Sequence, residues 1–134
     1  MYEPIRTKSV HSVPDAELPR RTREEELDIR LAGHLTALLT VTDELRALTP
    51  SAELDDAAHR LAAHAARLSG GVRPLRAAPT SAPSEQAHLA SLHQRAHMLA
   101  DYALALATTR DDTEAAELAA ERARSHAARQ PAAA

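Results

Sequence analysis

Apolar residues recur every three or four positions through most of this sequence, and the clearest row lies between residues 22 and 48. This spacing places the row on one face of an amphipathic helix. Thr22 can cap the start of that helix, and the three glutamates that follow suit its positive end. The positions on the face are Leu27, Leu31, His34, Leu38, Val41, Leu45 and Leu48, with Leu35 and Leu39 widening the stripe.

Three further helices are expected at about residues 50–69, 84–108 and 112–129. Pro50 suits the first turn of the second helix, and Gly70 and Gly71 can end it in the left-handed conformation. The stretch TTRDDTE indicates a break near residues 108–112, although one continuous helix from Ser84 to about Arg129 stays open. The expected inner face of the third helix is Leu89, Leu92, Ala96, Leu99, Ala103 and Leu106.

No stretch alternates apolar and polar residues as a half-buried strand does, so the predicted fold is all-α. We expect a small antiparallel helical bundle of three to four helices over residues 22–129, in which successive helices run up and down. Residues 1–21 contain three prolines and are expected to form an extended or disordered arm, and residues 130–134 a disordered tail. Residues 70–83 are a long connection for such a bundle.

Composition narrows the classes of function. The chain has no cysteine, which removes thiolate chemistry and suits a reducing compartment. MYEPIRTKSV is too polar for a signal peptide, and no apolar run approaches the roughly 20 residues of a membrane span. We therefore expect a cytoplasmic protein without a membrane partner. No glycine-rich phosphate loop or nucleophile motif is present, so we expect no enzyme and no cofactor.

The leucine row of residues 22–48 favours association with another protein. The second and fourth helices offer mostly alanine to cover it, and a large exposed apolar patch is unusual on a monomer. We predict a homodimer, or binding to a different protein, through uncovered leucines of this row. The predicted interface residues are Leu31, Leu35, Leu38, Leu39 and Leu45.

Eight histidines raise the alternative of a metal-binding bundle that uses His88, His93 and His97. HQRAH, residues 93–97, has the histidine spacing of the zinc motif HExxH, but Gln94 replaces the glutamate that would act as a base. Angular position on the helix favours a solvated or interface pair over a metal site, so no metal ligand is assigned. His126 falls in an expected flexible region, and His34 and His64 interrupt apolar faces, where they could bond to each other.

The glutamate-x-x-histidine pattern of di-iron bundles is imitated twice, by Asp56 with His59 and by Glu85 with His88. Both pairs lie at the N-terminal ends of successive helices. An up-and-down bundle would therefore hold them at opposite ends, about a helix length apart. On that argument we exclude a di-iron site.

A second alternative is a DNA-associated accessory protein. Its basic residues would be Arg20, Arg21 and Arg23 before the first helix and Arg67, Arg73 and Arg76 around the central loop. The net charge of −3 means that no global positive field attracts nucleic acid, and the absence of Phe and Trp leaves few rings on which bases could stack. We therefore do not expect a nucleic-acid partner, and the sequence indicates no particular small molecule.

Overall fold

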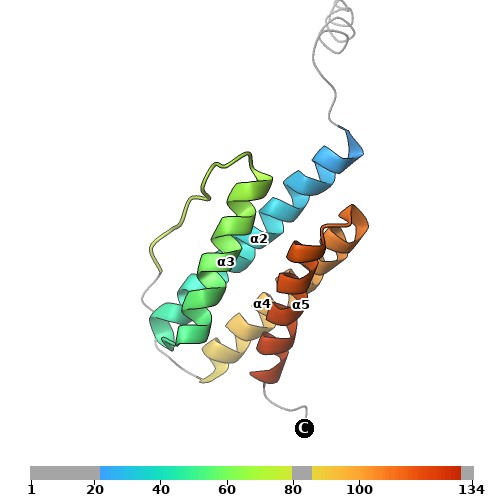
Figure 1. Cartoon of the computed structure of the whole chain (residues 1–134). Coiled ribbons are helices and arrows are strands. Elements are labelled where there is room, and N and C mark those ends of the chain that lie inside the picture. Colours follow the sequence, from blue (N-terminus) through green and yellow to red (C-terminus); the bar gives the residue numbers. More distant parts are fainter. Residues whose placement is uncertain (1–21, 80–85, 131–134) are drawn as a thin grey trace, which may run out of the picture.

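The computed structural model describes residues 22–79 and 86–130, and within them the chain forms four helices and no strands (Figure 1). They are α2 (Arg23–Leu48), α3 (Ala52–Leu68), α4 (Gln86–Arg110) and α5 (Thr113–Ala128). These ends lie within two residues of those expected from the sequence. The all-α helical bundle is confirmed, whereas the predicted N-terminal arm and most of the predicted C-terminal tail lie outside the described residues.

Side chains cap the helices at the positions where the sequence changes character. The Thr22 hydroxyl accepts the Glu25 backbone N–H at 3.1 Å, and the Glu25 carboxylate accepts the Thr22 N–H at 2.8 Å, which completes a capping box on α2. Helix α3 is capped by Ser51, whose hydroxyl accepts the N–H of Leu54 at 3.1 Å. This cap places the start of α3 two residues after Pro50.

Helices α4 and α5 are separate, which settles the break left open by the sequence. Asp111 takes a positive φ of 62°, a conformation that a continuous helix does not contain. Asp112 then caps α5 by accepting the Ala115 N–H at 3.2 Å. The chain therefore reverses within two residues, and α5 packs back along α4.

The order of the helices around the bundle differs from the up-and-down expectation. Helix α2 packs against both α3 and α4, and α5 packs mainly against α4 (Figure 1). Helices α3 and α4 run in the same direction, because the chain turns at Gly70 and Gly71 (φ 69° and 91°) and residues 72–79 return along the bundle. At roughly 3.3 Å per residue, residues 69–85 can span about twice the ~25 Å length of α3, so the long connection permits this return.

The core contains the leucine face of α2, and the same chain covers it. All five leucines predicted to form an interface are buried, with exposed fractions of 1% or less. The premise that the chain cannot cover this row is therefore wrong. The covering residues are mostly alanines, whose small side chains let the helices approach closely. The fully buried alanines are Ala57, Ala96, Ala100, Ala103, Ala107, Ala115 and Ala119.

Helix α4 faces the core with a different set of residues than expected. Its buried face is Leu92, His93, Ala96, Ala100, Ala103 and Ala107. The expected core residues Leu89, Leu99 and Leu106 lie at the border of this face and are partly buried. The face is rotated because a close approach to α2 and α5 favours alanine at the centre, which leaves the longer leucines to fill the flanks.

We predict that Leu38→Ala lowers the free energy of unfolding by about 2–5 kcal/mol, since the side chain is fully buried and its removal leaves a cavity. Leu75→Ala is the matched control, because Leu75 is 94% exposed and its loss should change stability by less than about 0.5 kcal/mol. Urea unfolding followed by circular dichroism measures both. Equal effects would contradict the assignment of Leu38 to the core.

Candidate functional site

The most unusual chemistry in the described chain is a row of four polar side chains, three of them buried, at the end of the bundle where α3 and α4 begin and α5 ends. The row consists of Glu53 on α3, Arg122 and His126 on α5, and His93 on α4, and is called here the buried polar cluster. Arg122 and His126 have exposed fractions of 0% and 1%, and His93 is also buried. Polar side chains this deep need partners, so their contacts decide what the cluster can do.

Hydrogen bonds connect the cluster from α3 to α4. Arg122 donates through Nη1 to Glu53 Oε2 at 3.1 Å, and its Nη2 lies 3.3 Å from Nε2 of His126. Nδ1 of His126 lies 3.0 Å from Nδ1 of His93. Since arginine only donates, Nε2 of His126 accepts and its proton sits on Nδ1, which then donates to Nδ1 of His93. Both histidines are therefore neutral, with the proton of His93 on Nε2.

Burial and neighbouring charge keep these histidines neutral. Burial, the Arg122 guanidinium and His93 together lower the pKa of His126 to about 3. Burial also lowers the pKa of His93, with Arg129 and Arg122 acting in the same direction. At the other end of the row, the hydrogen bond from Ser125 (2.6 Å) and the contact with Arg122 lower the pKa of Glu53. The cluster holds a fixed arginine–carboxylate pair beside two uncharged imidazoles.

Burial of the charged Arg122 side chain is the largest energetic cost in the cluster. Its side chain is fully buried, and its Nε is a buried donor without an acceptor among the described residues. Glu53 supplies the negative charge that balances it, and about two fifths of that carboxylate side chain stays in contact with solvent. Removing one member of a buried ion pair leaves an uncompensated charge, which destabilises the fold. Glu53 therefore stabilises the buried position of Arg122.

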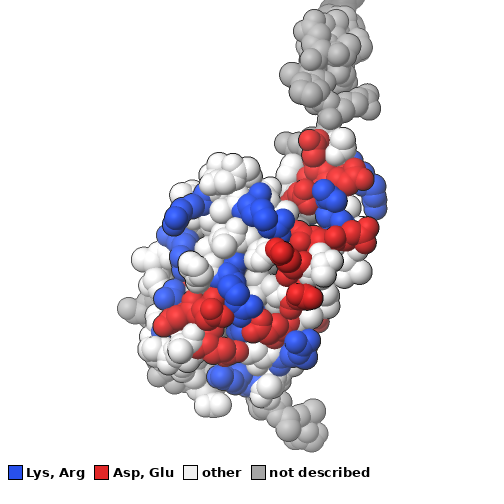
Figure 2. Space-filling view, in the orientation of Figure 1, with Lys and Arg blue, Asp and Glu red and all other residues white. Residues whose placement is uncertain are grey.

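Two more ion pairs join α3 to α5 outside the cluster. Arg60 donates to both carboxylate oxygens of Glu121 at 2.6 and 2.9 Å, and Arg67 donates to Asp112 at 3.0 Å. Figure 2 shows the result as acidic and basic side chains interspersed over the face that α3 and α5 form. The backbones of these two helices make few close contacts, so long polar side chains bridge them.

The histidines considered in the sequence analysis differ in burial and in hydrogen-bond partners. His93 is buried and bonded to His126, so the expectation of a solvated pair is wrong for it. His97 is partly exposed, with Nδ1 3.2 Å from the Gln130 amide and Nε2 3.3 Å from Asp101. His126 belongs to α5 and is buried, not flexible. The period of α5 offered a signal, because His126 follows Leu118, Ala119, Arg122 and Ala123 on one face.

The two histidines that interrupt apolar faces do not bond to each other. Nδ1 of His34 lies 3.0 Å from the Arg30 carbonyl, and its ring meets Tyr102 of α4 edge-on at a centroid distance of 5.5 Å. Nδ1 of His64 lies 2.7 Å from the Arg67 guanidinium. Both rings lie at the border of the core, where each finds a local partner.

The parallel course of α3 and α4 removes the geometric argument used against a di-iron site, since the N-terminal ends of both helices lie at the same end of the bundle. Asp56 and His59 are nevertheless exposed, while Glu85 lies outside the described residues. Within residues 22–79 and 86–130, no three histidine, aspartate or glutamate side chains are grouped so that they could hold a metal ion. The buried His93–His126 pair offers two nitrogens, and the adjacent Arg122 guanidinium disfavours a cation there.

Comparisons with known proteins return no match to this chain, whether against family models, curated proteins or solved structures. Among the helices that the structure describes, none combines the length and apolarity needed to cross a lipid bilayer.

We predict that stability falls as pH decreases below about 6.5, because His126 binds a proton more readily in the unfolded chain than in the folded one. Its pKa rises from about 3 to about 6.5 on unfolding, so its contribution is complete above pH 6.5 and is lost as pH falls toward 3. At about 1.4 kcal/mol per pH unit, lowering the pH from 7 to 5 should cost about 2 kcal/mol. Urea unfolding at several pH values measures this slope.

His126→Gln should flatten the slope, since glutamine can accept from Arg122 and donate to His93 without titrating in this range. The control is His59→Gln, which changes an exposed histidine on α3 that has no hydrogen-bond partner among the described residues. A slope that His126→Gln leaves unchanged would disprove the assignment.

A third prediction compares two carboxylates that bridge α3 and α5. Glu53→Gln should lower the free energy of unfolding by about 3 kcal/mol, because it removes the charge of the carboxylate that is bonded to the buried Arg122 guanidinium. Glu121→Gln removes a half-exposed partner of Arg60, and its cost should stay below about 1 kcal/mol. Thermal or urea unfolding distinguishes them, and the reverse order would show that Arg122 does not depend on Glu53.

Proposed function

We propose that this protein is a cytoplasmic, non-enzymatic helical-bundle interaction protein that forms a homodimer through the outer face of α2 and α4. The proposal moves the interface from the buried leucines of α2 to side chains that reach solvent. The observation that supports it most is the exposure of Tyr102 (52%) and Met98 (47%) on α4. The absence of cysteine suits a reducing compartment.

Tyr102 and Met98 are residue types that protein interfaces favour, and they are the two large apolar side chains that α4 exposes; elsewhere in the described residues Ile29, Val72 and Leu75 are also exposed. The whole sequence has no Phe or Trp and two tyrosines, so an exposed ring is a notable use of a rare residue. Tyr102 packs edge-on against His34 of α2, which orients the ring at the border between the two helices. Leu99 and Leu106 are partly buried on the same helix and extend the apolar surface toward the core.

The charges beside Met98 favour a second copy of the chain as the partner. Arg95 lies three residues before Met98 and Asp101 three residues after it, and both are exposed. If two α4 helices cross antiparallel at Met98, two-fold symmetry sets Arg95 of each copy opposite Asp101 of the other. The surface is therefore electrostatically complementary to itself. The α3–α5 face offers less, because its charges are already paired within the chain.

Light scattering coupled to size exclusion tests the dimer. We expect the mass of the chain to be twice the 14.4 kDa of the monomer and to fall to 14.4 kDa in Met98→Glu, which places an unpaired charge at the centre of the contact. Leu75→Glu is the matched control, since it introduces the same charge at a more exposed leucine elsewhere and should leave the dimer intact.

A charge exchange tests the geometry of the dimer. Arg95→Glu should weaken association, and the double variant Arg95→Glu with Asp101→Arg should restore it. A wild-type chain that stays at 14.4 kDa up to millimolar concentration rules out the homodimer. Failure of the double variant to restore association rules out the antiparallel crossing at Met98.

A further inference from the structure

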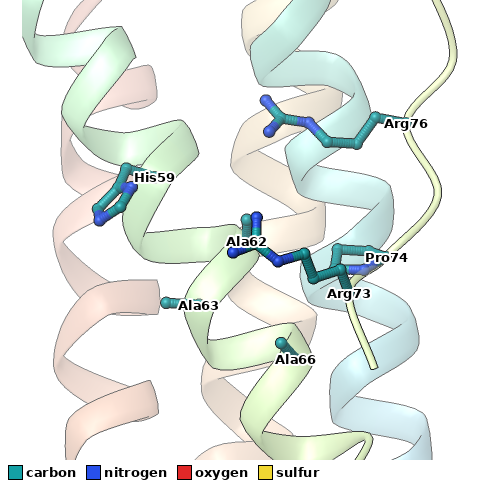
Figure 3. Close-up of a pocket in the computed structure, with 7 residues that line it drawn as sticks. All are labelled: His59, Ala62, Ala63, Ala66, Arg73, Pro74 and Arg76. Carbon is teal, nitrogen blue, oxygen red and sulfur yellow. The ribbon is translucent and has the colours of Figure 1, made fainter. Parts of the chain in front are cut away.

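A pocket of about 220 Å³ lies between α3 and the returning segment 69–79, on a different part of the molecule from the proposed dimer face. Figure 3 shows Arg73 and Pro74 reaching it from the segment, while His59 and three alanines border it from α3. Arg76 completes the lining, and no carboxylate takes part in it. Three cation-forming side chains and an alanine floor distinguish this pocket from the paired charges of the α3–α5 face.

Two fixed points hold the segment at this pocket. Gly70 and Gly71 adopt positive φ and turn the chain back at the end of α3. Further along, Arg76 donates through Nε and Nη2 to the two oxygens of Asp43 at 3.0 and 2.7 Å, and the Asp43 carboxylate is largely buried. Arg73 lies between these points, so its backbone is held beside α3 even though its side chain is exposed.

One of the two arginines that line the pocket has no acidic partner among the described residues. Of the three arginines around the central loop, Arg67 is paired with Asp112 and Arg76 with Asp43. Arg73 has no acidic partner in residues 22–79 and 86–130, and the Nη1 of Arg76 likewise has no acceptor there. Asp56, the acidic residue on the turn before His59, is paired with Arg60.

We propose that this pocket binds a phosphate group, either as the free anion or as a small phosphomonoester. The Arg73 guanidinium can donate a pair of hydrogen bonds that matches the oxygens of a tetrahedral anion, and the Nη1 of Arg76 can add a further donor. The volume lies below the roughly 300 Å³ at which pockets begin to enclose drug-sized ligands, so the site suits a compact anion rather than a nucleotide. The methyl groups of Ala62 and Ala63 provide a small apolar surface for the carbon atoms of a monoester.

The test uses the full chain labelled with ¹⁵N and titrated with inorganic phosphate at constant ionic strength. Saturable shifts of the Arg73 side-chain N–H and of backbone amides in residues 59–66 and 72–76 support the site. Arg73→Gln should weaken binding about tenfold, the effect of losing one charge-assisted contact. Arg124→Gln is the matched control, since Arg124 is an exposed arginine on α5 without a described acidic partner, and binding should stay unchanged.

A second variant separates a shaped pocket from simple surface charge. Ala63→Leu keeps every charge but fills part of the cavity, and it should also weaken binding. Shifts that grow without saturation, that chloride reproduces, or that survive Arg73→Gln or Ala63→Leu would overturn the proposal. Glycerol phosphate distinguishes the two sources of the anion: tighter binding than inorganic phosphate assigns the site to a monoester, and equal or weaker binding assigns it to the free anion.

Discussion

The bundle depends on one constraint, the need to cover the wide leucine face of α2 with helices whose inner faces are mostly alanine. Large side chains on every helix would hold the axes apart, whereas alanine on α4 and α5 lets the backbones come close enough to exclude water from the leucines. The leucines then fill the space that the alanines leave. A helix with few large apolar residues can therefore still cover the apolar face of its neighbour.

The same shortage of large apolar residues explains the polar contacts between α3 and α5. These two helices make few backbone contacts with each other, and arginine and glutamate side chains bridge the distance that alanine cannot. The stems of such arginines pack as apolar groups while their guanidinium ends find carboxylates. Arg122 is the extreme case, because its whole side chain is buried and the carboxylate of Glu53 stabilises its charge.

The period of apolar residues and the capping residues were enough to predict the helices. How the helices pack against one another could be established only from the structure. Thr22, Gly70 and Asp112 mark helix ends through local hydrogen bonds or backbone conformation, which a sequence records directly. The direction of α4 relative to α3 depends on where the long connection returns, and length alone allows either course. The buried polar cluster was missed for a related reason. His93 and His126 are 33 residues apart, and their contact exists only because α4 and α5 approach closely through alanine.

The composition of the helices overestimated how much of the leucine row of α2 would stay exposed. Counting large apolar residues assumes that a leucine face must be covered by other large side chains. Coverage depends instead on the distance between the helix axes, and small residues shorten that distance. Once α2 is buried by its own chain, the side chains left for recognition are those that the bundle does not use. On α4 these are Tyr102 and Met98, and beside α3 it is Arg73, which has no acidic partner within residues 22–79 and 86–130. The ion pairs of the α3–α5 face satisfy their own charges within the fold, so that face keeps fewer free charges for a partner than the two surfaces proposed above.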